Sequence, residues 1–227
     1  MRPLIGIVPL YDLEKKNNWM LTAYEQGVFE AGGLPVMLAL EPDDDYLEIL
    51  SHLDGLLVTG GQDIDPALYG EENTACGPLC PSLDQLEEKL IPKAIAMDLP
   101  VFGICRGHQV IAALGGGRLT QDVPGHRMEE PYNRTHHTVT LKGDLADLLG
   151  KESTETNSCH HQAVIELGPQ YEAEAFSEEG YIEALRHTGK TFVQSVQWHP
   201  EMNPDNPDSG LLFAAFVKAA ENFAAKK

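Results

Sequence analysis

The chain has 227 residues, of which 42% are hydrophobic, and this is enough for one α/β core in a single domain spanning 1–227. Its 16 basic and 35 acidic residues give a formal charge of −19, which argues against nucleic acid and anionic membranes as partners. No apolar stretch approaches the roughly 20 residues of a transmembrane helix, and the N-terminus leads into a predicted strand rather than a signal peptide, so a cytoplasmic protein is expected.

Hydrophobic patterning predicts alternating strands and helices in the first half of the chain. The predicted strands are 4–10, 35–40, 56–59 and 101–104, and the predicted helices are 20–31, 46–52 and 83–97. In the second half the predicted strands are 118–120, 137–141, 163–167, 172–176, 181–186 and 192–196, and a helix follows at about 209–224. Strands that alternate with helices require parallel crossovers. The pattern therefore predicts an α/β fold with a mainly parallel central sheet, helices on both faces and a strand-rich second half.

A cysteine stands between two glycines directly after the strand predicted at 101–104. The segment reads Gly103-Ile104-Cys105-Arg106-Gly107, and helical residues follow it. This spacing is the thiol version of the Gly-x-Ser-x-Gly elbow, in which a tight strand-to-helix turn presents a nucleophile. Helix N-terminal amides near the sulfur favour its thiolate form. An isolated cysteine between glycines is more often a packed turn residue, so the prediction needs a partner base.

The candidate base is His199, in the segment Trp198-His199-Pro200-Glu201 that follows the predicted strand 192–196. Pro200 restricts the backbone of the residue before it to extended geometry. Glu201 lies two residues on, where its carboxylate can orient the imidazole and stabilise the cationic form. The two segments together predict Cys105 as nucleophile, His199 as base and Glu201 as the orienting acid.

With these segments the chain resembles the class I glutamine amidotransferase-like proteins and, within them, the γ-glutamyl-γ-aminobutyrate hydrolase branch. Further matching segments are 57–66 with 69–71, and 157–164, so the resemblance spans nearly the whole chain. The elbow and the Trp-His-Pro-Glu segment indicate the superfamily, and the other segments indicate the branch. The resemblance implies a three-layer, flavodoxin-like fold. It also implies hydrolysis of a γ-glutamyl amide through a thioester, without a cofactor.

The resemblance also suggests roles for residues around the thiol. Gly60-Gly61 follow the third predicted strand, and the backbone amides of Gly61 and Arg106 are expected to form the oxyanion hole. Gln109 is expected to contact the γ-glutamyl group, and the 157–162 loop to form a wall of the substrate site. The predicted substrate-binding residues are Gly60, Gln109, His160, His161 and Gln162.

One departure from the family pattern precedes the nucleophile strand. The family often carries an Arg-Asp-x-x-Glu pattern there, whereas this chain keeps Asp84 and Glu87 and has Leu83 in place of the arginine. The change lies next to the 71–82 loop, which is expected to cover the leaving-group side. A second difference is Ser195, where a glycine is common.

Two pairs of adjacent histidines, His136-His137 and His160-His161, have the residue type of metal ligands. Adjacent residues on a strand point to opposite faces of a sheet, so one pair does not readily supply two ligands to one ion. The sequence therefore predicts no metal site.

The remaining cysteines carry no motif of their own. Cys76 and Cys80 lack the second cysteine pair of a zinc site, and Cys159 has neither a base nor an elbow beside it. Cys159 is therefore interpreted as a wall residue of the site without catalytic duty. The acidic run 43–45 is interpreted as a solvated turn before a helix.

Two alternative functions stay open. The first is a glutaminase subunit that delivers ammonia to a separate synthase, although Arg106 stands where such subunits commonly carry a small or apolar residue. The second is a catalytically silent binding protein, which the retained Cys105, His199 and Glu201 disfavour. The expected partner is a small γ-glutamyl substrate, and a homodimer is left open.

Overall fold

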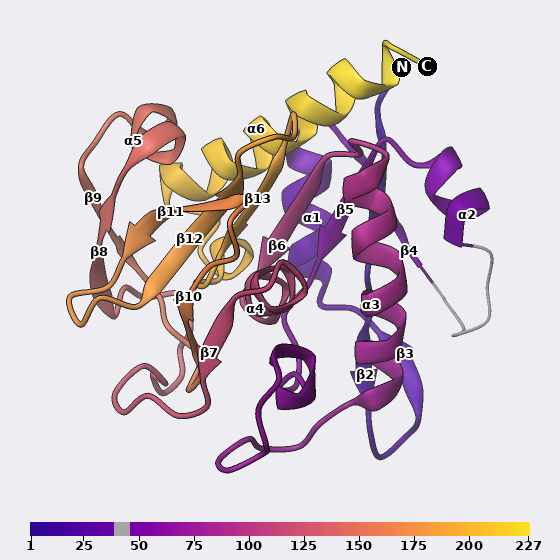
Figure 1. Cartoon of the computed structure of the whole chain (residues 1–227). Coiled ribbons are helices and arrows are strands. Elements are labelled where there is room, and N and C mark those ends of the chain that lie inside the picture. Colours follow the sequence, from indigo (N-terminus) through magenta and orange to yellow (C-terminus); the bar gives the residue numbers. More distant parts are fainter. Residues whose placement is uncertain (39–45) are drawn as a thin grey trace.

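The computed structural model describes residues 1–38 and 46–227. The predicted turn at 43–45 and the end of the predicted strand 35–40 lie outside the described residues. Within them the chain forms an 11-stranded sheet and a separate two-stranded hairpin (Figure 1). No described helix combines the length and apolar character needed to cross a membrane.

One half of the sheet is parallel. Its strands, in spatial order, are β4 (Leu34–Met37), β1 (Leu4–Ile7), β5 (Gly55–Val58), β6 (Val101–Ile104) and β13 (Val193–Val196). Every residue of β5 and β6 is buried. Continuous burial is typical of parallel strands that helices cover on both faces, and it explains why these strands read as unbroken apolar runs.

The other half of the sheet is antiparallel and continues from β13. Its strands in order are β12 (Ile182–His187), β11 (Tyr171–Phe176), β8 (His137–Leu141) and β9 (Ser153–Thr156). β10 (Ala163–Glu166) pairs with β12 and with β7 (Arg118–Thr120) beside this path. The prediction of a strand-rich second half is therefore confirmed.

The helices make two outer layers. One face packs against α2 (Tyr46–His52), α3 (Pro81–Ala96) and α4 (Arg106–Leu114), and the other against α1 (Thr22–Glu30), α5 (Gly143–Leu149) and α6 (Pro207–Ala224). Figure 1 shows α3 in front of the sheet and α6 behind it. Each face has its own cluster of buried apolar side chains. The predicted three-layer α/β fold is confirmed.

Some elements differ from the prediction. The single strand predicted at 4–10 divides into β1 and β2 (Leu10–Asp12), and β2 forms the hairpin with β3 (Asn17–Trp19). α5 and β9 were not predicted. α5 has only seven residues, begins at Gly143 and is followed by Gly150, both with positive φ, so its apolar pattern is too short to distinguish from a loop. Two 3₁₀ helices, η1 (Pro66–Tyr69) and η2 (Pro200–Met202), lie in segments that carry sequence motifs.

Candidate active site

The predicted catalytic segments meet because the strands before them run parallel and in register. Val58 of β5 lies opposite Gly103 of β6, and Val196 of β13 lies opposite Ile104. The residues that follow each strand therefore emerge at the same edge of the sheet. This edge brings together the Gly60-Gly61 turn, Cys105 and His199.

Cys105 occupies the strand-to-helix turn predicted for it. Its backbone has φ 54° and ψ −104°, a conformation that non-glycine residues rarely adopt, and its N–H donates to the Val196 carbonyl at 2.9 Å. A Cβ atom at Gly103 would lie 2.6 Å from Cδ1 of Ile111, and one at Gly107 would overlap the Val58 carbonyl. Close packing therefore requires glycine on both sides of the cysteine.

His199 is held through both its side chain and its backbone. Its Nδ1 donates to Oε1 of Glu201 at 2.7 Å, and both side chains are buried. Asn157 accepts from the His199 N–H at 2.8 Å and donates through Nδ2 to its carbonyl at 2.9 Å. Glu201 thus fixes the ring, and Asn157 fixes the chain that carries it. This positioning role of Asn157 was not predicted, because the sequence placed the residue only in a general substrate wall.

The two thiols near the cavity have different surroundings. Burial lowers the pKa of His199, but Glu201 and Cys105 outweigh burial and hold it well above its ordinary value. His199 is therefore placed to exchange a proton with the thiol of Cys105. By contrast, burial raises the pKa of the Cys159 thiol to about 11. The geometry and charges therefore favour Cys105 over Cys159 as the nucleophile.

The Gly60-Gly61 turn offers one free amide to a developing oxyanion. The Gly60 N–H already donates to the hydroxyl of Tyr24 at 3.0 Å. Within residues 1–38 and 46–227, the N–H groups of Gly61 and Arg106 donate to no protein acceptor. Gly61 has φ +153°, and an added Cβ would lie 3.1 Å from Cδ of Arg106. Both N–H groups are therefore free to donate to a ligand, and the oxyanion hole stays a prediction.

The side chain of Arg106 binds α3. Its guanidinium donates to both Glu87 and Asp84, and all three side chains are buried. The acids that remain from the family's Arg-Asp-x-x-Glu pattern are therefore partnered by the residue next to the nucleophile. Burial raises the pKa of both carboxyls, and Arg106 opposes this rise.

A cavity of about 190 Å³ opens beside the thiol. The predicted site residues that line it are Gly61, Cys105, Arg106, Gln109, His160, His161 and Gln162. Gly60 does not line it, consistent with the commitment of its amide to Tyr24. The loop predicted over the leaving-group side contributes Gly77 and Pro78.

Two charged residues that were not predicted from the sequence also line this cavity. The Asp63 carboxylate accepts from the Gly77 N–H at 2.6 Å and from Nε2 of His161 at 2.8 Å. Arg127 is exposed, and in the described part of the chain its guanidinium forms no hydrogen bond or ion pair. Asp63 lies in a motif segment and could have been proposed. Arg127 lies between the predicted strands 118–120 and 137–141, where nothing in the sequence marked it.

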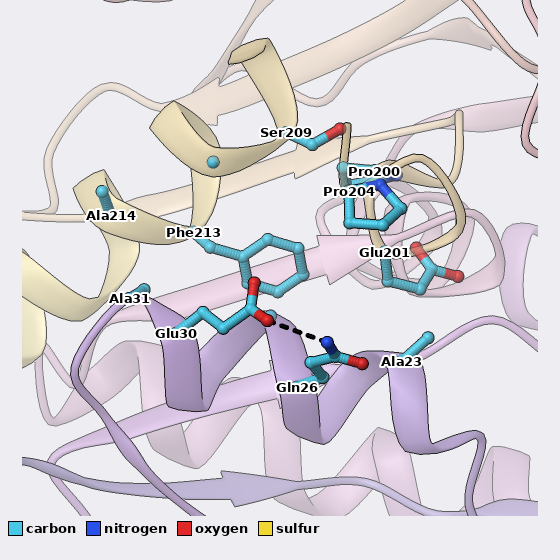
Figure 2. A pocket seen from close by; sticks show the side chains of 12 residues that line it. Ala23, Gln26, Glu30, Ala31, Pro200, Glu201, Pro204, Ser209, Phe213 and Ala214 are labelled. Carbon is cyan, nitrogen blue, oxygen red and sulfur yellow. Dashed lines mark hydrogen bonds between the residues drawn. The ribbon is translucent and has the colours of Figure 1, made fainter. Parts of the chain in front are cut away.

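A second cavity, also about 190 Å³, lies between α1, α6 and η2. Figure 2 shows Phe213 of α6 above Gln26 and Glu30 of α1, which are joined by a hydrogen bond of 2.8 Å, with Glu201 at one side. Cys105 does not line this cavity. The cavity next to the thiol is therefore the candidate reaction site.

The site thus places a cysteine elbow at the carboxyl edge of the sheet, beside a histidine paired with a glutamate. The chain belongs to the Peptidase C26 family, whose family model matches residues 3–201.

Named relatives agree with this assignment. A Mycobacterium tuberculosis protein, provisionally named glutamine amidotransferase Rv2859c, is 36% identical over 100% of this chain and 77% of its own length. γ-Glutamyl-γ-aminobutyrate hydrolase PuuD of Escherichia coli K12 is 30% identical over 99% of this chain and 96% of its own. A Thermoplasma acidophilum structure, provisionally described as one of the subunits of GMP synthase, shares the fold with a TM-score of 0.69 at 19% identity, covering 100% of this chain and 98% of that one. The Peptidase C26 family and the E. coli relative support a hydrolase.

Proposed function

We propose that the protein hydrolyses γ-glutamyl amides through a thioester at Cys105. The observation that carries this proposal is the buried thiol on a strained elbow, next to the His199–Glu201 pair and open to a cavity with charged walls. The E. coli relative named γ-glutamyl-γ-aminobutyrate hydrolase supports the choice of substrate class. Release of γ-aminobutyrate would give the enzyme a role in polyamine catabolism.

The reaction follows from the positions of these groups. The Cys105 thiolate attacks the γ-carbonyl carbon, and His199, which carries the thiol proton, protonates the departing amine as the C–N bond breaks. Water then gives a proton to His199 and attacks the thioester, and glutamate leaves with the thiolate restored. The amides of Gly61 and Arg106 stabilise the oxyanion in both steps. General acid–base and oxyanion contributions of about 10²–10⁴-fold and 10²–10³-fold are usual for such groups.

The charged cavity residues suit a glutamyl group. Its α-carboxylate matches the free guanidinium of Arg127, and its α-ammonium matches the carboxylate of Asp63. A bidentate guanidinium–carboxylate contact also orients the substrate. We assign these two residues to binding the amino acid end of the substrate, with Gln109, His160, His161 and Gln162 completing the walls.

Substrate preference distinguishes this proposal from a glutaminase subunit. We expect the purified chain alone to release glutamate from γ-glutamyl amides of small amino acids or amines with a higher kcat/KM than from glutamine. Activity without a partner is expected because the Gly61 and Arg106 amides are already free. The preference over glutamine is expected because the 71–82 loop, through Gly77 and Pro78, lines the cavity and can contact a larger leaving group. The measurement is glutamate release across a panel of γ-glutamyl amides, including γ-glutamyl-γ-aminobutyrate, an anilide and glutamine.

The control for that panel is Cys105→Ala, which must release no glutamate above the background rate with any member. Activity confined to glutamine, or seen only after a synthase is added, would favour the glutaminase subunit instead. No turnover of any member by wild-type protein would favour the silent binding protein.

Replacing the proposed base, His199, should lower kcat more than neutralising its partner, Glu201. We expect His199→Ala to lower kcat by about 10²–10⁴-fold, and Glu201→Gln to lower it less, because Glu201 acts only through the imidazole. Alkylation of Cys105 at neutral pH should slow in both variants, since both weaken the imidazolium that favours the thiolate. The measurements are kcat and the rate of iodoacetamide labelling. Equal labelling rates in wild type and both variants would assign the thiolate to the helix terminus instead.

A further inference from the structure

Four buried or partly buried acid and imidazole side chains converge in the strand-rich half of the fold. His126 lies in the loop between β7 and β8, His137 begins β8, His160 lies in the loop between β9 and β10, and Glu183 lies on β12. Nδ1 of His126 and Nε2 of His160 are each 3.8 Å from Oε1 of Glu183, and Nε2 of His137 is 3.8 Å from Oε2. One ligand atom each from His126, His160 and Glu183 lies within 4.8 Å of the others. Three of these residues thus form one cluster at Oε1 of Glu183, and His137 lies beside the other carboxylate oxygen.

The atoms that face one another have no hydrogen-bond partner. In the part of the chain that the structure describes, this holds for Nδ1 of His126, Nε2 of His137, Nε2 of His160 and both carboxylate oxygens of Glu183. His126, His160 and Glu183 are 3%, 4% and 0% exposed. Buried polar atoms are nearly always paired, because leaving one unpaired costs about 1–3 kcal/mol. So many in one place indicate a ligand.

The outer ring nitrogens fix the tautomers of two of these histidines. Nδ1 of His160 donates to the Gln162 carbonyl at 2.8 Å, and Nε2 of His126 lies 3.4 Å from Oε2 of Glu179. In the neutral ring the inward-facing nitrogen then carries a lone pair rather than a proton. A backbone carbonyl or carboxylate on the outer nitrogen is the usual support of a metal-binding histidine.

A divalent cation suits these lone pairs better than a proton or a water molecule. A proton can bridge one donor–acceptor pair, and 3.8 Å is too long for that hydrogen bond. A water molecule has two hydrogens, which is too few for three imidazole lone pairs and a carboxylate. A tetrahedral zinc site has metal–ligand bonds of about 2.0–2.1 Å, which place the ligand atoms about 3.4 Å apart. Each 3.8 Å separation from Glu183 exceeds this spacing by about 0.4 Å, and the ligand atoms of His126, His160 and Glu183, which lie within 4.8 Å of one another, need to approach by about 1.4 Å at most.

We propose that His126, His137, His160 and Glu183 bind one divalent transition-metal ion, for which zinc is the best match. Three imidazoles and one carboxylate are ligands that zinc prefers. Four protein ligands complete a tetrahedral shell and leave no open position for a substrate, so the proposed ion is structural. The thiol chemistry at Cys105 does not involve it.

The ion links the strand-rich half to the reaction site. His160 is a proposed ligand and also lines the cavity that contains Cys105. Its loop has no regular secondary structure, so the ion ties this wall to β8, β12 and the loop of His126. The site combines one histidine from each adjacent pair. Nε2 of His136 donates instead to the Gly125 carbonyl at 2.7 Å, and His161 binds Asp63.

The test is the metal content and thermal stability of the full chain. We expect purified wild-type protein, or chelator-treated protein supplied with Zn²⁺ and then desalted, to hold about one zinc per chain by elemental mass spectrometry. Tm should rise on zinc binding, and Co²⁺ in place of zinc should give the visible absorption bands of a tetrahedral site. His137 is the least buried of the four proposed ligands. The His137→Ala variant should lose most of the bound ion and most of the Tm increase. His136→Ala is the matched control and should retain both.

A second control separates this site from the reactive thiol, which also binds zinc in other proteins. Cys105→Ala should retain the ion and the Tm increase, whether or not the proposed hydrolase activity is correct. Loss of the ion from Cys105→Ala with retention in His137→Ala would place zinc at the thiol and overturn the proposal. Wild-type protein that takes up no ion from Zn²⁺, or shows the same Tm with and without it, would also overturn it.

Discussion

Cys105→Ala is expected to lower glutamate release from γ-glutamyl amides by at least about 10⁴-fold, because the other thiol that lines the cavity, Cys159, has a raised pKa and is a poor nucleophile. The variant should fold normally, since alanine is smaller than cysteine and the positive φ at this position is already present in the wild type. Its Tm should stay within about 4 °C of the wild-type value. Substrate binding should also survive, and isothermal titration calorimetry with the inactive variant would measure it.

The matched control for this prediction is Cys159→Ala. Cys159 lines the same cavity, but burial holds the pKa of its thiol at about 11, so it is a poor nucleophile at neutral pH. The variant should keep most of the activity. If the Cys159→Ala variant were inactive and the Cys105→Ala variant active, the assignment of the elbow cysteine as nucleophile would be refuted.

Arg106→Met is expected to destabilise the protein by about 3–5 kcal/mol, because it leaves Asp84 and Glu87 buried without their cationic partner. Chemical denaturation at neutral pH would measure the free energy of unfolding. The triple variant Arg106→Met, Asp84→Asn, Glu87→Gln removes the uncompensated charges and should recover much of this loss. Equal stability of the single and triple variants would show that packing, not charge, accounts for the effect.

The loss in Arg106→Met should depend on pH. Burial raises the pKa of both carboxyls above their unfolded values, and the variant lacks the guanidinium that opposes this rise. A raised pKa in the folded state means that the folded chain binds more protons, so stability falls as pH rises from about 4 through the folded pKa values. The difference from wild type should therefore be smallest near pH 4 and largest at neutral pH. A difference that does not change over this range would contradict the role of charge.

The sequence predicted the bounds of an element best where a clear hydrophobic pattern ends at a residue that breaks regular structure. The bounds of α2, β6, β7 and β8 match the predicted ranges. β6 is four consecutive buried residues between a proline and a glycine-flanked cysteine, which leaves little choice of boundary. The hairpin of β2 and β3 carries no such pattern, since Asn17 and Trp19 are exposed. Its strands form through pairing with each other, which single-segment patterning does not reveal.

Within the candidate site, the sequence predicted residues that belong to motifs and missed those that act through tertiary contacts. Tyr24 reaches the Gly60 amide from α1, and Arg127 reaches the cavity from a loop. The proposed metal site was missed for the same reason, because its ligands come together only through tertiary contacts. Neither pair of adjacent histidines supplies two ligands, but the structure combines one member of each pair with His126 and Glu183, which are far apart in sequence.

Covalent labelling with a thiol-reactive glutamine analogue, followed by peptide mass spectrometry and an assay of remaining activity, tests the assigned nucleophile most directly. We predict one label per chain, on Cys105, with loss of glutamate release in proportion to labelling and protection by a γ-glutamyl amide. Labelling of Cys105 with full retention of glutamate release, or inactivation through a label on another residue, would contradict the assignment.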